Sequence, residues 1–120
     1  MTPEQLQSIA FRWVENFNNK DFEKFLALYD DEAQHYSPKL KLKSPETNGL
    51  IQGKSAMQTW WKDNFNTQPE LQYILKSLTA NGDRVFMEYT RQNDSEEDLL
   101  VAEVLEVRDN KIVFSRVYHG

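Results

Sequence analysis

The stretch LLVAEVLEVRDNKIVFSRVYH, residues 99–119, decides the fold of this chain. It contains two runs rich in β-branched and aromatic residues, 99–108 and 111–119, on either side of the turn-forming pair Asp109-Asn110. Two such runs joined by a tight turn predict an antiparallel β-hairpin at the carboxyl end.

Two further strand-like runs precede this hairpin, at residues 70–79 and 84–92. The turn-forming segment 80–83, Ala-Asn-Gly-Asp, separates them, and the polar run 93–98 forms the next hairpin loop. The second half of the chain is therefore predicted to be a meander of consecutive antiparallel strands.

The first half of the chain has helical spacing of apolar residues in three segments, 3–18, 22–29 and about 54–65. The short segment 33–36 predicts a strand, and the proline- and glycine-containing segment 44–53 predicts a loop. Helices followed by an antiparallel meander predict an α+β fold with the helices on one face of the sheet.

The composition describes one small domain spanning residues 1–120. The chain has no cysteine, which excludes disulfides and thiolate metal sites and suits a reducing compartment. A formal net charge of −5 is unsuited to general nucleic-acid binding. The sequence has neither a signal-peptide pattern nor an apolar run of about 18 residues. We therefore expect a cytoplasmic protein that binds neither nucleic acid nor membrane.

One basic cluster stands out, formed by Lys39, Lys41 and Lys43 in alternation with leucine. The alternation predicts an extended segment with the three lysines on one side. Because lysine on an edge strand discourages association, we expect a solvated strand edge here and not an anion site.

The last predicted strand is apolar on both faces, with Val113 and Val117 on one face and Ile112 on the other. A one-layer antiparallel sheet usually has one solvated face, and no helix is predicted after the third one to cover this second face. We therefore predict a homodimer through the outer sheet face. That face is expected to include Phe86, Val104, Phe114 and Tyr118.

Three segments carry a resemblance to a known family: NFNNKDFEKFLALYDDEAQHYSPK (residues 16–39), GLIQGKSAMQTWW (49–61) and NKIVFSRVYHG (110–120). Together with the order of elements, they resemble the nuclear transport factor 2-like superfamily and, within it, the SnoaL-like and ketosteroid isomerase-like bacterial proteins. The resemblance implies a cone-shaped, curved antiparallel sheet wrapped around three amino-terminal helices, also described as cystatin-like. It further implies a pocket at the open end of the cone and a first strand that lies beside the last.

The catalytic motif of the ketosteroid isomerases matches this chain poorly. The family's oxyanion tyrosine falls on Trp13, its aspartate base on Ser37 and its supporting tyrosine on Trp61. Its acidic oxyanion donor falls near Glu103. Because serine cannot replace a carboxylate in proton transfer, we expect no steroid isomerase activity by that mechanism.

His35 and His119 are the two histidines of the chain, and the implied neighbourhood of the first and last strands brings them together. Imidazole titrates near neutral pH, so both are candidate catalytic residues. Glu103, an acidic residue in an apolar strand, is a third candidate, and a structural ion pair with Arg91 is its alternative role. The alternative for the histidines is a structural His35 and a solvent-facing His119. Zinc would need a third ligand, for which the sequence offers Glu103 alone, so we expect no metal and no other cofactor.

The walls of the pocket are expected to come from side chains on the same inward-facing positions, which are equally suited to a hydrophobic core. The predicted substrate-binding residues are Trp13, Phe17, Ser37, Trp61, Met87, Tyr89 and Arg91.

Two functions fit these features. The first is an enzyme of the isomerase, cyclase or lyase type that moves protons on a small apolar carbonyl compound. The second is a non-catalytic module that binds or senses a small apolar ligand on the same scaffold. Polar groups that converge within one substrate length favour the enzyme, and a pocket that is plugged favours the module.

Overall fold

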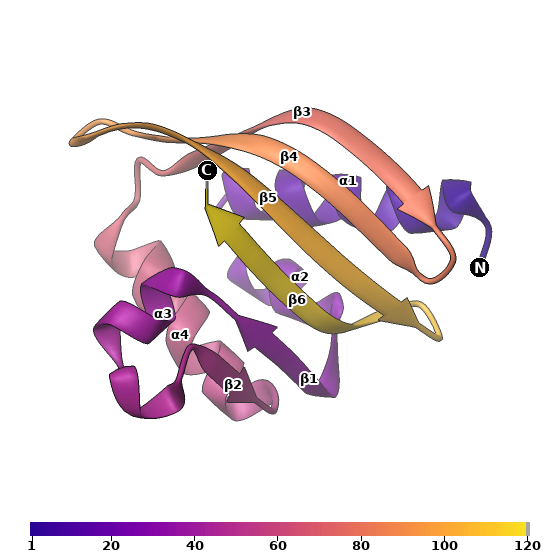
Figure 1. Ribbon diagram of the computed structural model, residues 1–120, viewed down its shortest axis with the longest axis horizontal. Coiled ribbons are helices and arrows are strands. Elements are labelled where there is room, and N and C mark those ends of the chain that lie inside the picture. The colour runs from indigo at the N-terminus through magenta and orange to yellow at the C-terminus, as the bar shows by residue number, and fades with distance from the viewer. Residues whose placement is uncertain (120) are drawn as a thin grey trace.

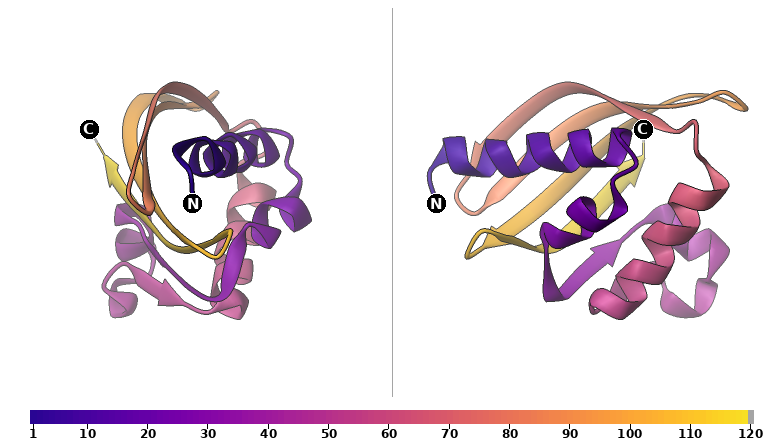
Figure 2. Two further views of the ribbon diagram at one scale, coloured as in Figure 1. Left: turned by 90° about the vertical axis from the view of Figure 1, so that its right-hand side faces the viewer. Right: turned by 180° about the vertical axis from the view of Figure 1, so that it is seen from behind.

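Six strands form one curved sheet in the order β2-β1-β6-β5-β4-β3 (Figure 1). The computed structural model describes residues 1–119. The strands are β1 (Tyr29–Tyr36), β2 (Leu50–Gln52), β3 (Gln72–Asn81), β4 (Arg84–Asn93), β5 (Glu96–Arg108) and β6 (Lys111–His119). The helices are α1 (Pro3–Asn18), α2 (Phe22–Ala27), α3 (Pro38–Lys43) and α4 (Lys54–Thr67), with a 3-10 turn at Pro45–Thr47. Figure 2 shows the long strands curling around α1, which confirms the predicted α+β architecture.

The predicted hairpins are present. Asp109 and Asn110 both have positive φ, 52° and 65°, as a two-residue turn that matches the twist of the flanking strands requires. Gly82, with φ of 65°, lies in the turn between β3 and β4. The loop between β4 and β5 is shorter than the polar sequence predicts, because β5 already begins at Glu96.

The first strand lies beside the last, as the family resemblance implies. β1 and β6 run parallel, with His35 opposite Ser115, whereas the other neighbouring strands are antiparallel. Parallel neighbours need a long crossover connection, and α3, α4 and the meander provide it. The sheet is therefore antiparallel except at the pair of strands that carries His35.

β1 is longer than predicted. The second helix ends at Ala27, and the strand begins at Tyr29, which pairs with Ile112 of β6. The three acidic residues that follow Tyr29 belong to the strand, at an irregularity in its pairing with β6. Negative charge at the carboxyl end of a helix is unfavourable, which explains the earlier helix end.

The lysine cluster is not on a strand, so the prediction of a solvated strand edge is wrong. Lys39, Lys41 and Lys43 belong to the short helix α3. Ser37 caps this helix by accepting a hydrogen bond from the Lys39 amide at 3.2 Å, and Pro38 occupies a first-turn position that suits proline. The predicted loop that follows also contains the unpredicted strand β2.

The prediction for Ile112 is wrong as well. It was placed on the outer face of β6, but it is fully buried in the core. The pairing of β5 with β6 shifts by one residue between Glu106, opposite Phe114, and Val107, opposite Ile112. Such a bulge reverses the side to which the preceding residues point, so simple alternation fails at the start of β6.

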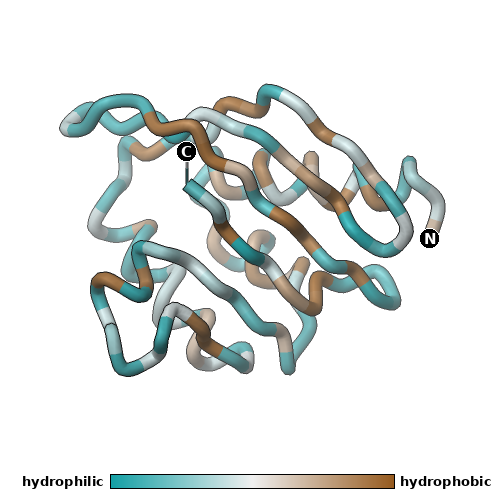
Figure 3. Tube along the Cα trace, viewed as in Figure 1, coloured by the Kyte–Doolittle hydropathy of each residue, from teal (hydrophilic) through white to brown (hydrophobic). Residues whose placement is uncertain are grey.

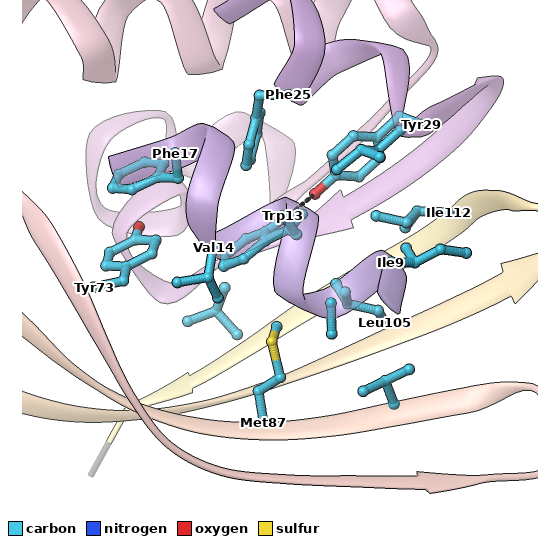
Figure 4. Packing of buried hydrophobic residues seen from close by; sticks show 14 of the residues in the cluster. Ile9, Trp13, Val14, Phe17, Phe25, Tyr29, Tyr73, Met87, Leu105 and Ile112 are labelled. Carbon is cyan, nitrogen blue, oxygen red and sulfur yellow. Dashed lines mark hydrogen bonds between the residues drawn. The ribbon is translucent and has the colours of Figure 1, made fainter. Parts of the chain in front are cut away.

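Aromatic side chains fill the space between the helices and the sheet (Figure 4). Trp13 of α1 lies at the centre, with its ring 5.6 Å from Tyr73 and 5.4 Å from Phe25, centroid to centroid. Phe17 stacks on Tyr73 at 3.9 Å. This aromatic packing holds α1 and α2 against β3 and sets the position of the strands that carry the polar residues.

α1 begins where the sequence predicts. The Thr2 side chain accepts from the Gln5 amide at 3.1 Å, and the Gln5 side chain accepts from the Thr2 amide at 2.9 Å. None of the helices in residues 1–119 combines the length and the apolar composition that a membrane crossing requires.

The outer face of the sheet exposes apolar side chains from several strands, and Figure 3 shows hydrophobic and hydrophilic residues interspersed along them. Phe86 and Tyr118 are exposed, Phe114 is half-buried and Val104 is buried between its neighbours. The exposed large hydrophobic residues of the sheet are Leu50, Ile74, Phe86, Leu100 and Tyr118. Single exposed apolar residues are common, but a set on one face suits an interface.

We predict that this outer face forms a homodimer. Light scattering at micromolar concentration should give twice the chain mass of 14.2 kDa. Phe86→Lys should give the monomer, because it places a charge within the apolar face. The control Phe11→Lys changes a similarly exposed phenylalanine on α1 and should leave the dimer intact. A wild-type protein with the mass of one chain would contradict the prediction.

Candidate functional site

A small pocket opens where the ends of β4, β5 and β6 meet α4 and the start of α3. Its walls come from His35, Ser37, Lys39, Trp60, Trp61, Asn64, Leu71, Tyr73, Tyr89, Arg91, Val101, Val117 and His119. The cavity volume is about 30 Å³, enough for one or two water molecules. Strand register explains why residues from three strands line one pocket. Tyr89 of β4 lies opposite Val101 of β5, and Val101 lies opposite His119 of β6.

Most of the predicted site residues line this pocket. The predicted residues that line it are His35, Ser37, Trp61, Tyr89, Arg91 and His119. Trp13, Phe17 and Met87 were also predicted to bind substrate, but they are buried in the core and do not line it. The sequence does not separate these two groups, because core and pocket residues share the same spacing.

His35 is buried at the inner end of the pocket. Its Nδ1 lies 2.6 Å from Ser115 Oγ, and its ring lies 5.2 Å from the Trp61 ring, centroid to centroid. Burial is the main cause that lowers the pKa of His35 from 6.5 to about 3, and a weaker hydrogen bond with the Ser115 backbone opposes it. The imidazole is therefore neutral at physiological pH.

Ser115 belongs to a buried four-residue hydrogen-bond chain that runs from α1 to the pocket. Trp13 Nε1 donates to Tyr29 Oη at 3.0 Å (Figure 4), and Tyr29 Oη donates to Ser115 Oγ at 3.1 Å. His35 completes the chain through its contact with Ser115 Oγ. Three elements, α1, β1 and β6, thus hold one imidazole ring in place.

The direction of this chain as far as Ser115 follows from its first member, because an indole N–H can only donate. Tyr29 accepts from Trp13 and so passes its own hydrogen to Ser115. The contact between Ser115 Oγ and His35 Nδ1 allows two arrangements: the hydroxyl donates to Nδ1, or Nδ1–H donates to the hydroxyl oxygen. In the first arrangement His35 carries its hydrogen on Nε2, and in the second on Nδ1.

Glu103 does not line the pocket but lies behind Tyr89. Tyr89 Oη donates to Glu103 Oε1 at 2.7 Å, and Glu103 Oε2 is buried without a partner. Burial raises the pKa of Glu103 from 4.5 to about 8, and the hydrogen bond from Tyr89 opposes this shift. The carboxyl group is thus mostly protonated near pH 7 and reaches the pocket only through Tyr89.

The alternative of an ion pair between Glu103 and Arg91 is wrong. The Arg91 guanidinium binds Gln68 Oε1 at 2.9 Å and Glu96 Oε1 at 3.5 Å. Arg91 is two residues beyond Tyr89 on the same face of β4, so its side chain lies at the pocket mouth. Glu103 lies deeper in the protein, behind Tyr89. Lys39 Nζ lies 3.8 Å from the other oxygen of Glu96.

His119 lies at the pocket mouth and is partly buried. Burial is the largest cause that lowers its pKa from 6.5, and the positive charges of Lys39 and Arg91 lower it further. At neutral pH this imidazole is therefore mostly uncharged, like that of His35.

Sequence reasoning missed several features of the candidate site. Ser115 shares the inward face of β6 with His119, so strand alternation alone could have suggested it. Tyr29 was assigned to a helix, which hid its place in the hydrogen-bond chain. Trp61 was predicted, but its buried Nε1 has no hydrogen-bond partner within residues 1–119, which no pattern reveals.

Within the described residues 1–119, no group of three or more histidine, aspartate or glutamate side chains is placed to hold a metal ion.

Comparison with known proteins identifies the fold. A family model described as a SnoaL-like domain matches residues 10–115. A SnoaL-like protein of unknown function from Burkholderia thailandensis has a TM-score of 0.88 at 21% identity, covering 100% of this chain and 98% of that one. A search of curated proteins found no match.

Two further solved structures are similar in fold. One, a "putative ketosteroid isomerase" from Kribbella flavida, has a TM-score of 0.80 at 19% identity, covering 98% of this chain and 79% of that one. The other, a "putative polyketide cyclase" from Sinorhizobium meliloti, has a TM-score of 0.80 at 12% identity, covering 98% and 100%. The resemblance seen in the sequence is thus confirmed at the level of family and fold.

We predict that Glu103 makes folding stability fall as pH rises from 6.5 to 8. In this range the carboxyl group is ionised in the unfolded chain, whereas the folded protein keeps its proton up to a pKa of about 8, so higher pH favours unfolding. The slope should be at most about 1.4 kcal/mol per pH unit. Both histidines have lowered pKa values, so each makes stability rise with pH, an effect that fades as pH passes through the unfolded value of 6.5 and is the same in the wild type and in a Glu103 variant.

Urea unfolding of Glu103→Gln measures this effect, because glutamine resembles the protonated acid and cannot ionise. Its free energy of unfolding should change less between pH 6.5 and 8 than that of the wild type. Glu97→Gln, at an exposed position of the same strand, is the control and should behave like the wild type. Equal pH dependence in wild type and Glu103→Gln would show that Glu103 is already ionised in the folded protein.

Proposed function

The chain belongs to the SnoaL-like domain family, and from that premise we propose that its pocket binds a small apolar carbonyl compound and catalyses proton transfer next to the carbonyl group. The observation that carries the proposal is the buried, neutral His35, held by the hydrogen-bond chain in the wall of the pocket. In the proposal Ser115 donates to Nδ1, so that the ring hydrogen is on Nε2 and serves the ligand. A preorganised donor in a water-poor site stabilises the negative charge that develops on a carbonyl oxygen during enolisation.

His35 serves in this proposal as the electrophilic donor and not as the base. A base must accept a proton, but the lowered pKa of His35, about 3, makes its imidazole a very weak acceptor. His35 is suited to this role by its orientation, because the contact with Ser115 fixes the ring. In the proposed tautomer the second nitrogen keeps its hydrogen and donates it to the carbonyl oxygen. Removal of one such donor typically lowers the rate by roughly 10²–10³-fold.

His119 serves as the proton acceptor. Lys39 and Arg91 help to keep its imidazole neutral, so a lone pair is available near pH 7. It lines the same pocket as His35, from the neighbouring end of β6. Two histidines in different environments thus take different roles, one as a donor to oxygen and one as a base toward carbon.

Steroids are poor candidates for the ligand. Ser37, which falls on the family's base position, uses its oxygen to cap α3. Trp13, which falls on the oxyanion donor position, donates to Tyr29 within the core. The cavity of about 30 Å³ is also far smaller than a site of roughly 300 Å³ or more for a drug-sized ligand.

The same small cavity supports the second candidate, a binding or sensor module. Aromatic side chains fill most of the space, and a ligand would have to displace some of them. Trp60 and Asn64 are half-buried at the mouth and are suited to such movement. A module of this kind needs no proton transfer, which separates the two candidates experimentally.

We predict that the protein accelerates hydrogen–deuterium exchange at the α-carbon of small ketones or β-keto esters in D₂O, followed by NMR. His35→Ala should lower the rate roughly 10²–10³-fold, and His119→Gln roughly 10²–10⁴-fold. The control Gln34→Ala changes the neighbour of His35 in β1 and should keep the wild-type rate. Circular dichroism checks that each variant is folded.

Exchange at the buffer rate for every compound would contradict the catalytic proposal. If such compounds still bind, and His35→Ala changes their affinity by no more than one hydrogen bond, about 0.5–1.5 kcal/mol, the binding module is the correct function.

A further inference from the structure

The pocket mouth is cationic although the chain as a whole carries a formal charge of −5. Arg91 is 5% exposed, and its guanidinium is therefore held inside the protein at the mouth. Lys39 approaches from the first turn of α3 and lines the same pocket. Burial of a guanidinium is costly unless it is paired, so its partners indicate what this position binds.

The partner present is the carboxylate of Glu96, and it is held loosely. Its oxygens lie 3.5 Å from Arg91 and 3.8 Å from Lys39, and its side chain is 44% exposed at the start of β5. Close charge-assisted hydrogen bonds are shorter than 3 Å. The hydrogen bonds found within residues 1–119 use two guanidinium nitrogens of Arg91, for Gln68 and Glu96, and neither is a close bidentate pair with a carboxylate.

We propose that the ligand is a small apolar acid, and that Arg91 and Lys39 bind its carboxylate in place of the Glu96 carboxylate. The proposal rests on the proposed function in one respect, that this pocket is the ligand site. It adds the ligand's chemical class and assigns the mouth residues a role in recognition. Glu96 then acts as an internal competitor that occupies the two cations until the ligand arrives.

The shape of the surface next to the mouth leaves room for the body of such a ligand. A hollow of about 320 Å³ is lined by Lys39, Leu42, Lys43, Trp60, Asn64 and Gln68. Lys39, Trp60 and Asn64 also line the inner pocket, so these side chains separate the two spaces. Leu42 is 82% exposed, which gives the hollow an apolar wall.

The position of His119 supports the same arrangement. Lys39, Arg91 and His119 all line the one pocket, and after burial the positive charges of Lys39 and Arg91 are the further causes that lower the pKa of His119. A carboxylate bound there would lie within reach of both cations and beside the proposed base.

Benzoate and benzamide test the proposal, because they share shape and differ in charge. Isothermal titration or NMR titration of the full chain should show binding of benzoate at least about ten-fold tighter than that of benzamide. Glu96→Gln, at an exposed position, should tighten benzoate binding several-fold because it removes the competitor. Glu106→Gln makes the same charge change in the outer-face pair with Arg116 and Arg84, and should have no effect.

Lysine variants give a second matched pair that does not disturb the buried arginine. Lys39→Met should weaken benzoate binding about ten-fold, whereas Lys41→Met, exposed on the same helix, should not. Arg91→Gln should weaken it further if the variant folds. Benzamide binding should be unchanged in all of them.

Equal binding of benzoate and benzamide, or no tightening in Glu96→Gln, would overturn the proposal. The outcome is independent of catalysis. Preference for benzoate without any α-proton exchange would support the acid-binding mouth and refute the enzyme. Exchange on neutral ketones without a preference for benzoate would support the enzyme and refute the acid-binding mouth.

Discussion

The site depends on one hydrogen bond, between His35 Nδ1 and Ser115 Oγ, across the parallel pair of strands β1 and β6. The pairing places these two residues directly opposite each other, so the contact is a property of the sheet itself. Behind it, Tyr29 and Trp13 continue the hydrogen bonding into the aromatic core. The core therefore does more than stabilise the fold, because its hydrogen bonds hold an imidazole in place at the pocket.

Burial divides the titratable groups by role. His35 and Glu103 are both fully buried, and desolvation keeps each of them uncharged near neutral pH, one by lowering its pKa and the other by raising it. The charged groups Arg91, Lys39 and Glu96 gather at the mouth, where mutual contacts stabilise all three and solvent stabilises Lys39 and Glu96. The interior thus offers neutral hydrogen-bonding groups, and the mouth offers charge.

The sequence predicted the elements well where the pattern was local. The strands of the meander and α1 follow from alternation, helical spacing, turn residues and a capping box, which are properties of neighbouring residues. The prediction of a strand for the lysine segment is wrong because Ser37 and Pro38 start a helix that is too short to show a periodic pattern. The prediction that Ile112 faces outward is wrong because a bulge, which is set by the pairing of two strands, reverses the alternation.

The site was predictable in part, where the order of the strands and the alternation of side chains along them decide which residues face inward. His35 and His119 were found because the implied adjacency of the first and last strands is correct, and the parity of the strands points both inward. Trp13, Phe17 and Met87 have the same inward parity, and only depth in the folded core separates them from the pocket wall. The partner of Glu103 could not be predicted, because Tyr89 and Arg91 share one face of β4 and differ only in how far they lie from the mouth.

Nitrogen-15 NMR of the His35 ring tests most directly whether the hydrogen-bond chain sets this imidazole. The chemical shifts should show hydrogen on Nε2 and a lone pair on Nδ1, and they should stay constant from about pH 5 to about pH 8. Hydrogen on Nδ1, or titration of His35 near its ordinary pKa of 6.5, would show that Ser115 does not hold the ring as a neutral donor.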